Sequence, residues 1–440
     1  MRFDYFFKLA KEYGIEDVEL FVSSKETLSF QLFHGKIDEF SNNKSLNVVA
    51  RGIVNGKFGS ASSDVYNKEK ALYLVEQIKQ NASIIENDDP AIIFSGSKRY
   101  QHINTYNKEL KDMPVEEKIK VLSGLDGAIR NADNRIIEVA EVGYSEQDEE
   151  INIINSKGLK LKQRNNFFYS FAQAVAKENE QVKSGFKIFF NNDFNQFNVE
   201  EFAKEIAKET TSKLGGEPCK SKKYKAVLDK DVVASLLRPY ISNASSEQIQ
   251  KGSSLFIGKL NTKIASSKIT ITDEPLRKNV FVRTFDDEGV ATSNKPIIKN
   301  GMLMNYLYNL KTAAKENRES TGNGYRGGAS IDVEASFLYL KPGKKSLEEL
   351  FQTIGNGVYI TDVTGLHAGL NSQSGNFSLQ SAGFEIIDGK IGKALDGITV
   401  SGNLMELFND VKEVGSDSKI NHMASQTSSV IVKSLSVSGK

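Results

Sequence analysis

Alternating apolar and polar residues predict the strands of the first part of the chain. The alternation places strands at residues 18–22, 28–33 and 46–50, with turns at His34-Gly35 and Asn55-Gly56. Apolar residues at helical spacing predict a helix on either side, over residues 1–13 and 67–81. The first unit of the chain is therefore expected to run helix, antiparallel strands, helix.

A second unit with the same order follows. Its predicted segments are a helix at 114–132, strands at 136–140, 150–154 and 167–171, and a helix at 198–214. Lys157-Gly158 corresponds to His34-Gly35, and Gly185 corresponds to Gly59. Such units bury one sheet face under their helices, so residues 1–215 are expected to form an N-terminal α+β domain with an internal duplication. Gly215-Gly-Glu-Pro218 ends the last helix and marks the boundary.

Residues 220–440 are richer in short strands and glycine turns. Strands are predicted at 225–228, 268–272, 336–340, 357–361, 383–387 and 429–435. Helices are predicted at 231–250, 302–316, 346–355 and 403–411. The expected fold class is α+β, with a C-terminal domain built on a curved, barrel-like antiparallel sheet with inserted helices.

Composition and charge exclude several classes of protein. The 440 residues include 57 Lys plus Arg and 56 Asp plus Glu, a net charge of +1 that offers no general attraction to nucleic acid. The single cysteine, Cys219, allows no internal disulfide. Residues 1–12 have the pattern of an amphipathic helix and not of a signal peptide, and no segment approaches the roughly 20 apolar residues that span a membrane. We expect a cytoplasmic protein with no nucleic-acid or membrane partner.

Several short motifs occur in a fixed order in the second half. They are Lys251-Gly-Ser-Ser254, Thr272-Asp-Glu-Pro275, Phe285-Asp-Asp-Glu-Gly289, Lys299-Asn-Gly-Met302, Ser320-Thr-Gly-Asn323, Asp388-Gly-Lys390 and Ser401-Gly-Asn-Leu404. Together with the loop 364–378, this order resembles the TldD/TldE (PmbA) family. The resemblance is strong over residues 250–440 and weaker over 1–215. It implies a role in the proteolytic maturation or degradation of small peptides, in a family also labelled as modulators of DNA gyrase.

The zinc-bearing members of that family carry His-Glu-x-x-x-His on the helix before the Lys-Gly-x-Ser element. Counting back from Lys251, the histidine positions fall on Leu237 and Ser242 and the glutamate position on Arg238. Leucine has no lone pair, and arginine is a fixed cation that cannot serve as a base. The resemblance therefore implies the metal-free, TldE-like subunit, with no catalytic residue, no metal ligand and no cofactor of its own. Zinc is expected in a TldD-like partner.

No replacement metal site or nucleophile is visible elsewhere. The four histidines, His34, His102, His367 and His422, have no short ligand spacing. His422 lies near the segment where zinc-bearing relatives place a cysteine ligand, but one histidine without helix ligands does not hold a metal. There is no Gly-x-Ser-x-Gly element for nucleophilic hydrolysis.

The most distinctive loop, residues 364–378, closely resembles a signature of the family. Its candidate contact residues are Thr364, His367, Asn371, Ser374, Phe377 and Ser378. Its glycines and hydroxyl groups suit either the wall of a peptide-binding cleft or a subunit contact, and they suit equally a tight structural crossover in the sheet. The residues alone leave these alternatives open.

Two further motifs have mainly structural interpretations. Phe285-Asp-Asp-Glu-Gly289 places three carboxylates together, and we expect a solvated turn because adjacent turn residues usually point apart. Gly322-x-Gly324-x-x-Gly327 matches a dinucleotide-binding pattern only formally, because a helix is predicted before it and a polar loop after it.

Two functions from different classes remain. The first is the non-catalytic subunit of a heterodimeric metallopeptidase that holds unfolded peptides. The second is a stand-alone homodimeric binding or regulatory protein, similar to a DNA gyrase modulator, with no proteolytic role.

Overall fold

The structure is a computed structural model that describes residues 3–15, 17–327 and 330–440. Its N-terminal domain contains one six-stranded antiparallel sheet of the order β3-β2-β1-β4-β5-β6. The strands are β1 (Asp17–Phe33), β2 (Lys36–Val54), β3 (Lys57–Ser63), β4 (Ile136–Asn155), β5 (Lys160–Glu178) and β6 (Gln181–Asn191). The helices are α1 (Asp4–Glu12), α2 (Lys68–Ser83), α3 (Lys108–Asp112), α4 (Val115–Ser123), α5 (Leu125–Ala132), the 3-10 turn η1 (Phe194–Gln196) and α6 (Val199–Thr211).

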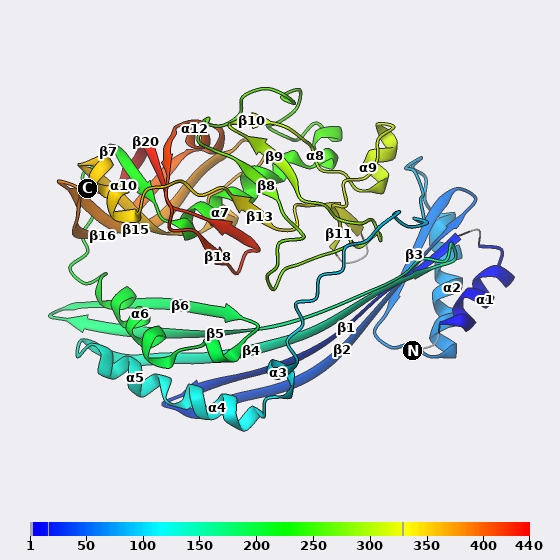
Figure 1. Cartoon of the computed structure of the whole chain (residues 1–440), viewed down its shortest axis with the longest axis horizontal. Helices are drawn as coiled ribbons and strands as arrows, with labels where there is room; N and C mark the ends of the chain where they lie inside the picture. The colour runs from blue at the N-terminus through cyan, green and yellow to red at the C-terminus, as the bar shows by residue number, and fades with distance from the viewer. Residues whose placement is uncertain (1–2, 16, 328–329) are drawn as a thin grey trace.

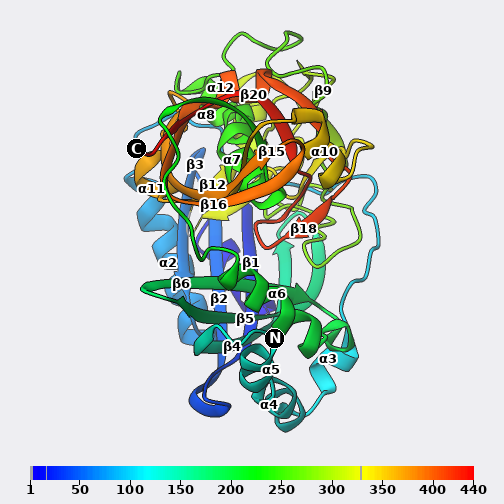
Figure 2. The same cartoon turned by 90° about the vertical axis from the view of Figure 1, so that its left-hand side faces the viewer.

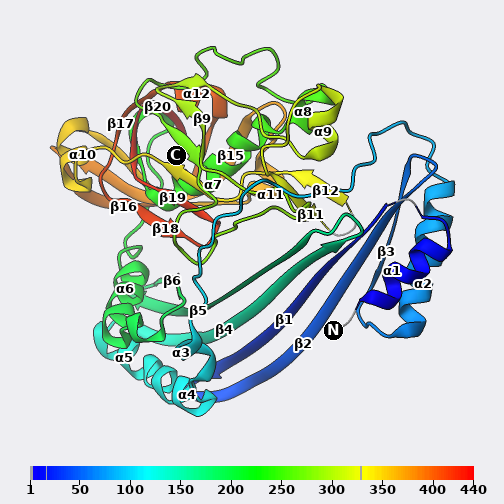
Figure 3. The same ribbon diagram turned by 45° about the vertical axis from the view of Figure 1, so that its right-hand side comes forward.

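The predicted duplication is confirmed. One unit is α1, β1 to β3 and α2, and the other is α3 to α5, β4 to β6 and α6. The first strands of the two units, β1 and β4, pair antiparallel at the centre of the sheet, from Glu19 opposite Asn155 to Leu32 opposite Val142. Figures 1 and 3 show the resulting sheet as a long half-barrel that curves beneath the C-terminal domain. The turns at His34-Gly35 and Asn55-Gly56 have positive φ angles, as their sequences predict.

Glycine occupies the same place in both units because a helix crosses the third strand there. A Cβ at Gly59 would lie 1.8 Å from the carbonyl oxygen of Ile78 in α2. A Cβ at Gly185 would lie 2.3 Å from the hydroxyl of Thr210 in α6. The correspondence between Gly59 and Gly185 therefore has a steric cause.

Each unit buries the outer face of the half-barrel under its own helices. α1 and α2 cover Leu20 and Val22, whereas the helices of the second unit cover Phe30 and Tyr144. The residues that alternate with these along β1, such as Glu19 and Phe21, point to the inner face of the half-barrel. The C-terminal domain covers part of that inner face.

The C-terminal domain combines a closed barrel with a second sheet. The barrel contains β7 (Lys222–Leu228), β14 (Gly357–Thr364), β15 (Asn376–Ile387), β16 (Lys390–Asn403) and β20 (Val430–Ser438), closed by the pairing of β16 with β20, and β17 (Val411–Val414) pairs with β20. The second sheet contains β8 (Ile271–Asp273), β9 (Lys295–Lys299), β10 (Met302–Leu303), β13 (Leu338–Leu340), β18 (Lys419–Asn421) and β19 (Ser425–Thr427). A separate hairpin joins β11 (Gly324–Gly327) to β12 (Ser330–Val333). The helices are α7 (Lys230–Ile241), η2 (Ser242–Ala244), α8 (Ser246–Gln250), α9 (Leu310–Lys315), α10 (Leu347–Ile354), α11 (Leu366–Gly369) and α12 (Leu404–Asn409).

Several predicted elements differ from the observed ones in extent. The predicted strands at 18–22 and 28–33 are one strand, β1, and the predicted helix at 114–132 divides at Gly124 into α4 and α5. The helix predicted at 302–316 is wrong over its first half, where β10 pairs with β9 and only residues 310–315 are helical. The long strand β16 was not predicted, because its exposed stretch contains few apolar residues.

The largest core of the molecule surrounds α7. Val233, Leu236 and Leu237 of this helix lie in one apolar cluster with residues from both sheets of the C-terminal domain. Within the described residues, no helix combines the length and apolar character that crossing a membrane requires.

We predict that Gly59→Ala lowers the free energy of unfolding by about 2–3 kcal/mol, because its methyl group would overlap the α2 backbone. Gly127→Ala in α5 is the matched control. Nothing lies within 4 Å of a Cβ at Gly127, so it should raise stability by about 0.5–1 kcal/mol. Urea unfolding of both variants checks this. Equal effects from the two substitutions would contradict the steric role of Gly59.

Candidate functional site

Helix α7 places the three degenerate zinc positions in different environments. The Asp229 side chain caps the helix and accepts a hydrogen bond from the Asp231 amide at 2.9 Å. Leu237 points into the core and is fully buried. Arg238 is partly buried, and Ser242 is exposed in η2, where the helix has ended. The helix therefore brings Arg238 and Ser242 to one surface and directs Leu237 away from it.

Arg238 fixes α7 to two other segments of the chain. Its Nη2 donates to the carbonyl of Met423 at 2.9 Å and to that of Ala424 at 3.3 Å, and its Nη1 donates to the carbonyl of Ala335 at 3.3 Å. Burial lowers the pKa of Arg238, while the negative charges of Glu334 and Asp273 oppose this shift. The guanidinium acts as an internal cation surrounded by main-chain carbonyls.

These residues do not fit a zinc ion. Leu237 has no donor atom and lies in the core, and the Arg238 guanidinium carries the positive charge that a metal would otherwise bring. Among the described residues, no group of three or more His, Cys, Asp or Glu side chains could hold a metal. His422 lies beside α7, in the turn whose Met423 and Ala424 carbonyls Arg238 binds, and it belongs to no such group of three among the described residues.

A groove of about 420 Å³ runs beside the C-terminal end of α7. Arg238, Ser242 and Lys251 line one part of it, and residues 332–335 line the other. Glu247 in its wall pairs with both Lys251 and Lys311, at 3.1 and 3.3 Å. The groove offers polar side chains and main-chain groups of β12 and the residues after it, a surface suited to binding an extended chain.

The loop 364–378 contains both structural and exposed residues. The Asn371 carboxamide accepts hydrogen bonds from the amides of Gln373 and Ser374, and Phe377 is buried, so these residues shape the crossover into β15. Thr364, His367, Ser374 and Ser378 are exposed. The Ser372 carbonyl accepts a hydrogen bond from Asn243 of η2 at 3.1 Å, so the loop lies next to the end of α7.

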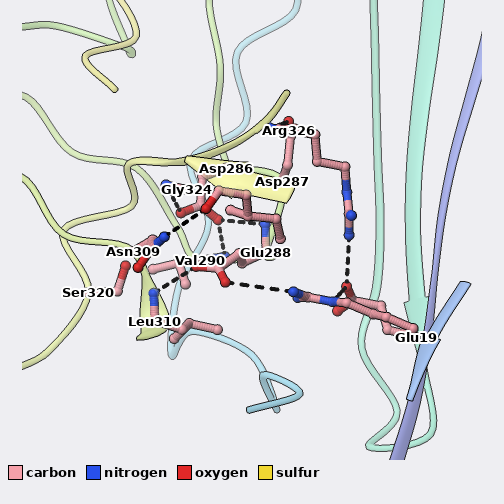
Figure 4. Close-up of polar contacts among 12 residues, drawn as sticks. Glu19, Asp286, Asp287, Glu288, Val290, Asn309, Leu310, Ser320, Gly324 and Arg326 are labelled. Atoms are coloured by element: carbon pink, nitrogen blue, oxygen red, sulfur yellow. Dashed lines mark hydrogen bonds and ion pairs between the residues drawn. The ribbon is translucent and has the colours of Figure 1, made fainter. Parts of the chain in front are cut away.

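The Asp286-Asp287-Glu288 turn is not solvated, and the expectation of an exposed turn is wrong. All three residues are buried, with exposed fractions of 0, 6 and 4%. Asp286 accepts hydrogen bonds from the amides of Glu288, Val290 and Gly324 at 2.9–3.0 Å, so the turn folds around this carboxylate (Figure 4). The turn was misjudged because its burial depends on contacts with the distant N-terminal domain.

Charged residues of the half-barrel complete this buried cluster. Arg51 of β2 donates to Glu19 of β1 at 2.8 Å and lies 3.7 Å from Glu288. Arg326 of β11 packs over the ring of Phe21, and its Nη2 lies 3.5 Å from Glu19, as Figure 4 shows. Sequence reasoning missed Glu19 and Arg51. Their signal was a single charged residue inside an otherwise apolar strand segment, in Val18-Glu-Leu-Phe-Val22 and Val48-Val-Ala-Arg-Gly52.

Burial raises the pKa of Asp286 well above its ordinary value, and the nearby Glu288 carboxylate raises it further. Burial also raises the pKa of Glu288, which the positive charge of Arg51 opposes. The cluster thus holds carboxyl groups that bind protons more tightly in the folded protein than in the unfolded chain.

The glycine motif at residues 322–327 does not form a dinucleotide site. Gly324–Gly327 is strand β11, and it continues into β12 instead of a helix. The N-terminus of a helix, which a pyrophosphate requires, does not follow the glycines. Asn323 instead donates to the buried Asp273 at 2.7 Å.

Family models match most of the chain. The model described as the PmbA/TldA metallopeptidase C-terminal domain matches residues 221–439, that of the central domain matches 108–214, and that of domain 1 matches 18–82. Among curated proteins, a metalloprotease of Methanothermobacter thermautotrophicus is 25% identical over 92% of this chain and 89% of its own length. A metalloprotease PmbA homologue of Buchnera aphidicola is 26% identical over 98% of this chain and 100% of its own length.

Solved structures share the fold over the full chain. A Thermotoga maritima protein, described as a candidate modulator of a DNA gyrase, has a TM-score of 0.91 and 32% identity, with 99% of each chain covered. TldE of Thermococcus kodakarensis has a TM-score of 0.90 and 23% identity, with 98% of each chain covered, and supports the fold alone.

We predict that Arg238→Met lowers the free energy of unfolding by about 2 kcal/mol, because the carbonyls of Ala335, Met423 and Ala424 lose their shared donor. Arg318→Met is the control, since Arg318 is 56% exposed and should change stability by less than about 0.5 kcal/mol. Denaturant unfolding measures both. A neutral Arg238→Met would show that the guanidinium does not hold α7 to the 423–424 turn.

The raised pKa of Asp286 predicts a loss of stability with rising pH. A carboxyl whose folded pKa exceeds its unfolded value, about 4, stabilises the protein fully below that value, and its contribution is lost as pH rises through the folded pKa. Relative to Asp286→Asn, the wild type should therefore lose stability as pH rises above about 4, by at most about 1.4 kcal/mol per pH unit.

Asp133→Asn provides the opposite case. The hydrogen bond that Arg135 donates to Asp133 lowers the pKa of this carboxyl to about 2. Relative to Asp133→Asn, the wild type should therefore be stabilised above pH 4 and should lose this stabilisation as pH falls toward 2. Chemical unfolding across this pH range tests both signs. A wild-type profile parallel to that of Asp286→Asn would contradict a proton held at Asp286.

Proposed function

The chain belongs to the PmbA/TldD metallopeptidase family, and we propose that it is the metal-free subunit of a cytoplasmic TldD/TldE-type complex. In such a complex a zinc-bearing partner cleaves small peptides for their maturation or degradation. This chain would complete the chamber around the partner's zinc and hold the peptide in an extended form.

The observation that carries this proposal is the environment of the two residues at the degenerate zinc positions of α7. Leu237 is packed into the core and Arg238 is bound by carbonyls, so the helix that would supply metal ligands supplies a rigid wall instead. The groove beside it is nevertheless retained, with Arg238, Ser242 and the 332–335 segment along its length. β12 pairs only with β11 in the described part of the chain, and extended peptides commonly bind by adding a strand to such an edge.

An open strand edge supports assembly with a second subunit. Among the residues that the structure describes, 36–47 of β2 pair with β1 on one side only, because β3 begins to pair at Val48. Ile37 and Phe40 on this stretch are 49 and 53% exposed. The rest of this stretch is mostly polar, so the unpaired main-chain groups of β2 and these two side chains are the surface on which we place a partner subunit. The exposed residues Thr364, His367 and Ser378 offer a second surface for the partner or the peptide.

We predict that the isolated chain does not cleave an unstructured peptide and that cleavage appears when a His-Glu-x-x-x-His partner from the same genome is co-purified. Phe40→Asp should weaken the complex, because it places a charge on the open β2 edge. Tyr73→Asp on the outer side of α2 is the matched control, as Tyr73 is 42% exposed and lies away from that edge. Light scattering and peptide cleavage measure assembly and activity.

Two outcomes would overturn the proposal. Metal-dependent cleavage by the isolated chain would show that it carries its own catalytic site. A stable homodimer that ignores the zinc-bearing protein, with cleavage by that protein unchanged, would favour the stand-alone regulatory function instead.

A further inference from the structure

A second cleft lies between the two domains, away from α7. Its volume is about 560 Å³. One wall comes from the end of β6 and from α6, and the other comes from residues 278–280 and the start of β18 at 419–420. Figures 1 and 2 show β18 above the part of the half-barrel that ends in β6.

The cleft follows the edge of β6, not one of its faces. Ile188, Phe189 and Phe190 all line it, although successive strand residues point to opposite faces. Phe189 packs on Phe197 on the helix-covered side, and Phe190 packs on Phe281 of the C-terminal domain. Only a space that wraps around the strand edge can contact all three residues.

The main chain of β6 is open along this edge. β6 is the last strand of its sheet and pairs with β5 alone in the described residues. In an antiparallel pair, alternate residues direct both main-chain groups away from the partner strand. The Ser184 carbonyl accepts a hydrogen bond from Lys213, which shows that the even-numbered residues point outward. Ile188 and Phe190 therefore present an amide and a carbonyl each to the cleft.

A buried donor in the opposite wall lacks an acceptor. The side-chain oxygen of Asn279 accepts from the Phe281 amide at 2.7 Å, but its Nδ2 is buried and has no hydrogen-bond partner among the described residues. An unpaired buried amide nitrogen is costly unless a ligand or water accepts its hydrogen bond.

The two walls carry opposite charges. Glu201 and Glu205 lie one turn apart on α6, and Lys278 and Lys419 lie on the C-terminal side. None of the four forms an ion pair in the described part of the chain, unlike Lys183 of β6, which pairs with Asp396 of the C-terminal domain. The free carboxylates stand on the side of β6 that α6 covers, whereas Val280 and Ile420 line the other side.

From these observations we infer that the cleft binds an extended peptide as an added strand on β6. Side chains that face α6 are basic and meet Glu201 and Glu205, and the alternate side chains are apolar and pack on Phe190, Val280 and Ile420. At about 3.3 Å per residue, the edge from 188 to 192 accommodates about five residues. The inference rests on the proposed function only in taking a polypeptide as the ligand, and its site is separate from the groove beside α7.

Fluorescence anisotropy with the full-length chain and three labelled peptides tests this inference. An octapeptide of alternating lysine and valine should bind, and one of alternating glutamate and valine should bind at least about tenfold more weakly because its charges face Glu201 and Glu205. A lysine–proline octapeptide should not bind, because proline cannot donate the main-chain hydrogen bonds of an added strand. Binding of the lysine–valine peptide should weaken as salt concentration rises.

Matched variants locate the binding edge. Ile188→Pro removes one outward amide donor inside the cleft and should weaken binding of the lysine–valine peptide about five- to tenfold. Val182→Pro removes an outward donor of the same strand outside the cleft and should leave binding unchanged. Glu201→Lys should weaken binding about tenfold, whereas Glu200→Lys, which makes the same charge change on a residue that does not line the cleft, should not.

Equal effects of each variant and its control, or equal affinity for the two charged peptides, would overturn the inference. Loss of self-association in Ile188→Pro would also overturn the inference, because it would show that the open edge of β6 binds a second copy of the chain. If Ile188→Pro does not fold, the comparison of Glu201→Lys with Glu200→Lys decides the outcome. Peptide binding lost in Glu201→Lys with partner-dependent cleavage intact would support the inference and leave the proposed function standing, whereas peptide binding without any partner-dependent cleavage would overturn the proposed function alone.

Discussion

The buried contact of Arg51 with Glu19 and Glu288 joins the two domains and restricts how they can move relative to each other. Arg51 and Glu19 belong to the central strands of the half-barrel, and Glu288 belongs to the C-terminal domain. All three are buried, so each charge has given up water and depends on the others. Removing one partner would leave an uncompensated buried charge, which costs about 3–5 kcal/mol. A shift of either domain relative to the other would also separate these buried charges, and the energetic cost of that separation restricts the relative positions of the domains.

The backbone supports this ionic contact on both sides. Three amides hold the Asp286 carboxylate, and the Leu310 amide donates to Glu288 at 2.7 Å. Tyr100, in the segment that connects the two units of the half-barrel, donates to the Gly289 carbonyl at 2.7 Å. The acidic turn is therefore fixed from its own domain and from the N-terminal domain. The cleft beside β6 lies between the same two domains, where Phe190 packs on Phe281.

Helix α7 borders a groove without offering a metal ligand to it. Its cap, its core residues and its position between the two sheets require only apolar packing and one aspartate. Leu237 and Arg238 satisfy the helix in ways that exclude metal binding, one by filling the core and the other by binding carbonyls. Arg238 also lines the groove beside the helix, and its hydrogen bond to the Ala335 carbonyl holds the 332–335 segment that forms the other part of the wall.

The sequence by itself determined most of the element types, the duplication and the residue types at the zinc positions, although the helix predicted at 302–316 was wrong over its first half and strand β16 was missed. Alternation and helical spacing are local properties, and the steric reason for Gly59 and Gly185 is a repeated helix-on-strand contact within each unit. It also determined that Leu237 and Arg238 cannot hold zinc, because donor atoms belong to residue types. Only the tertiary structure decided that Asp286, Asp287 and Glu288 are buried, and that β6 borders a cleft. Those outcomes arise from contacts such as that of Arg326 with Glu19, 307 residues apart, and no local pattern records which distant surface will exclude water from a charge.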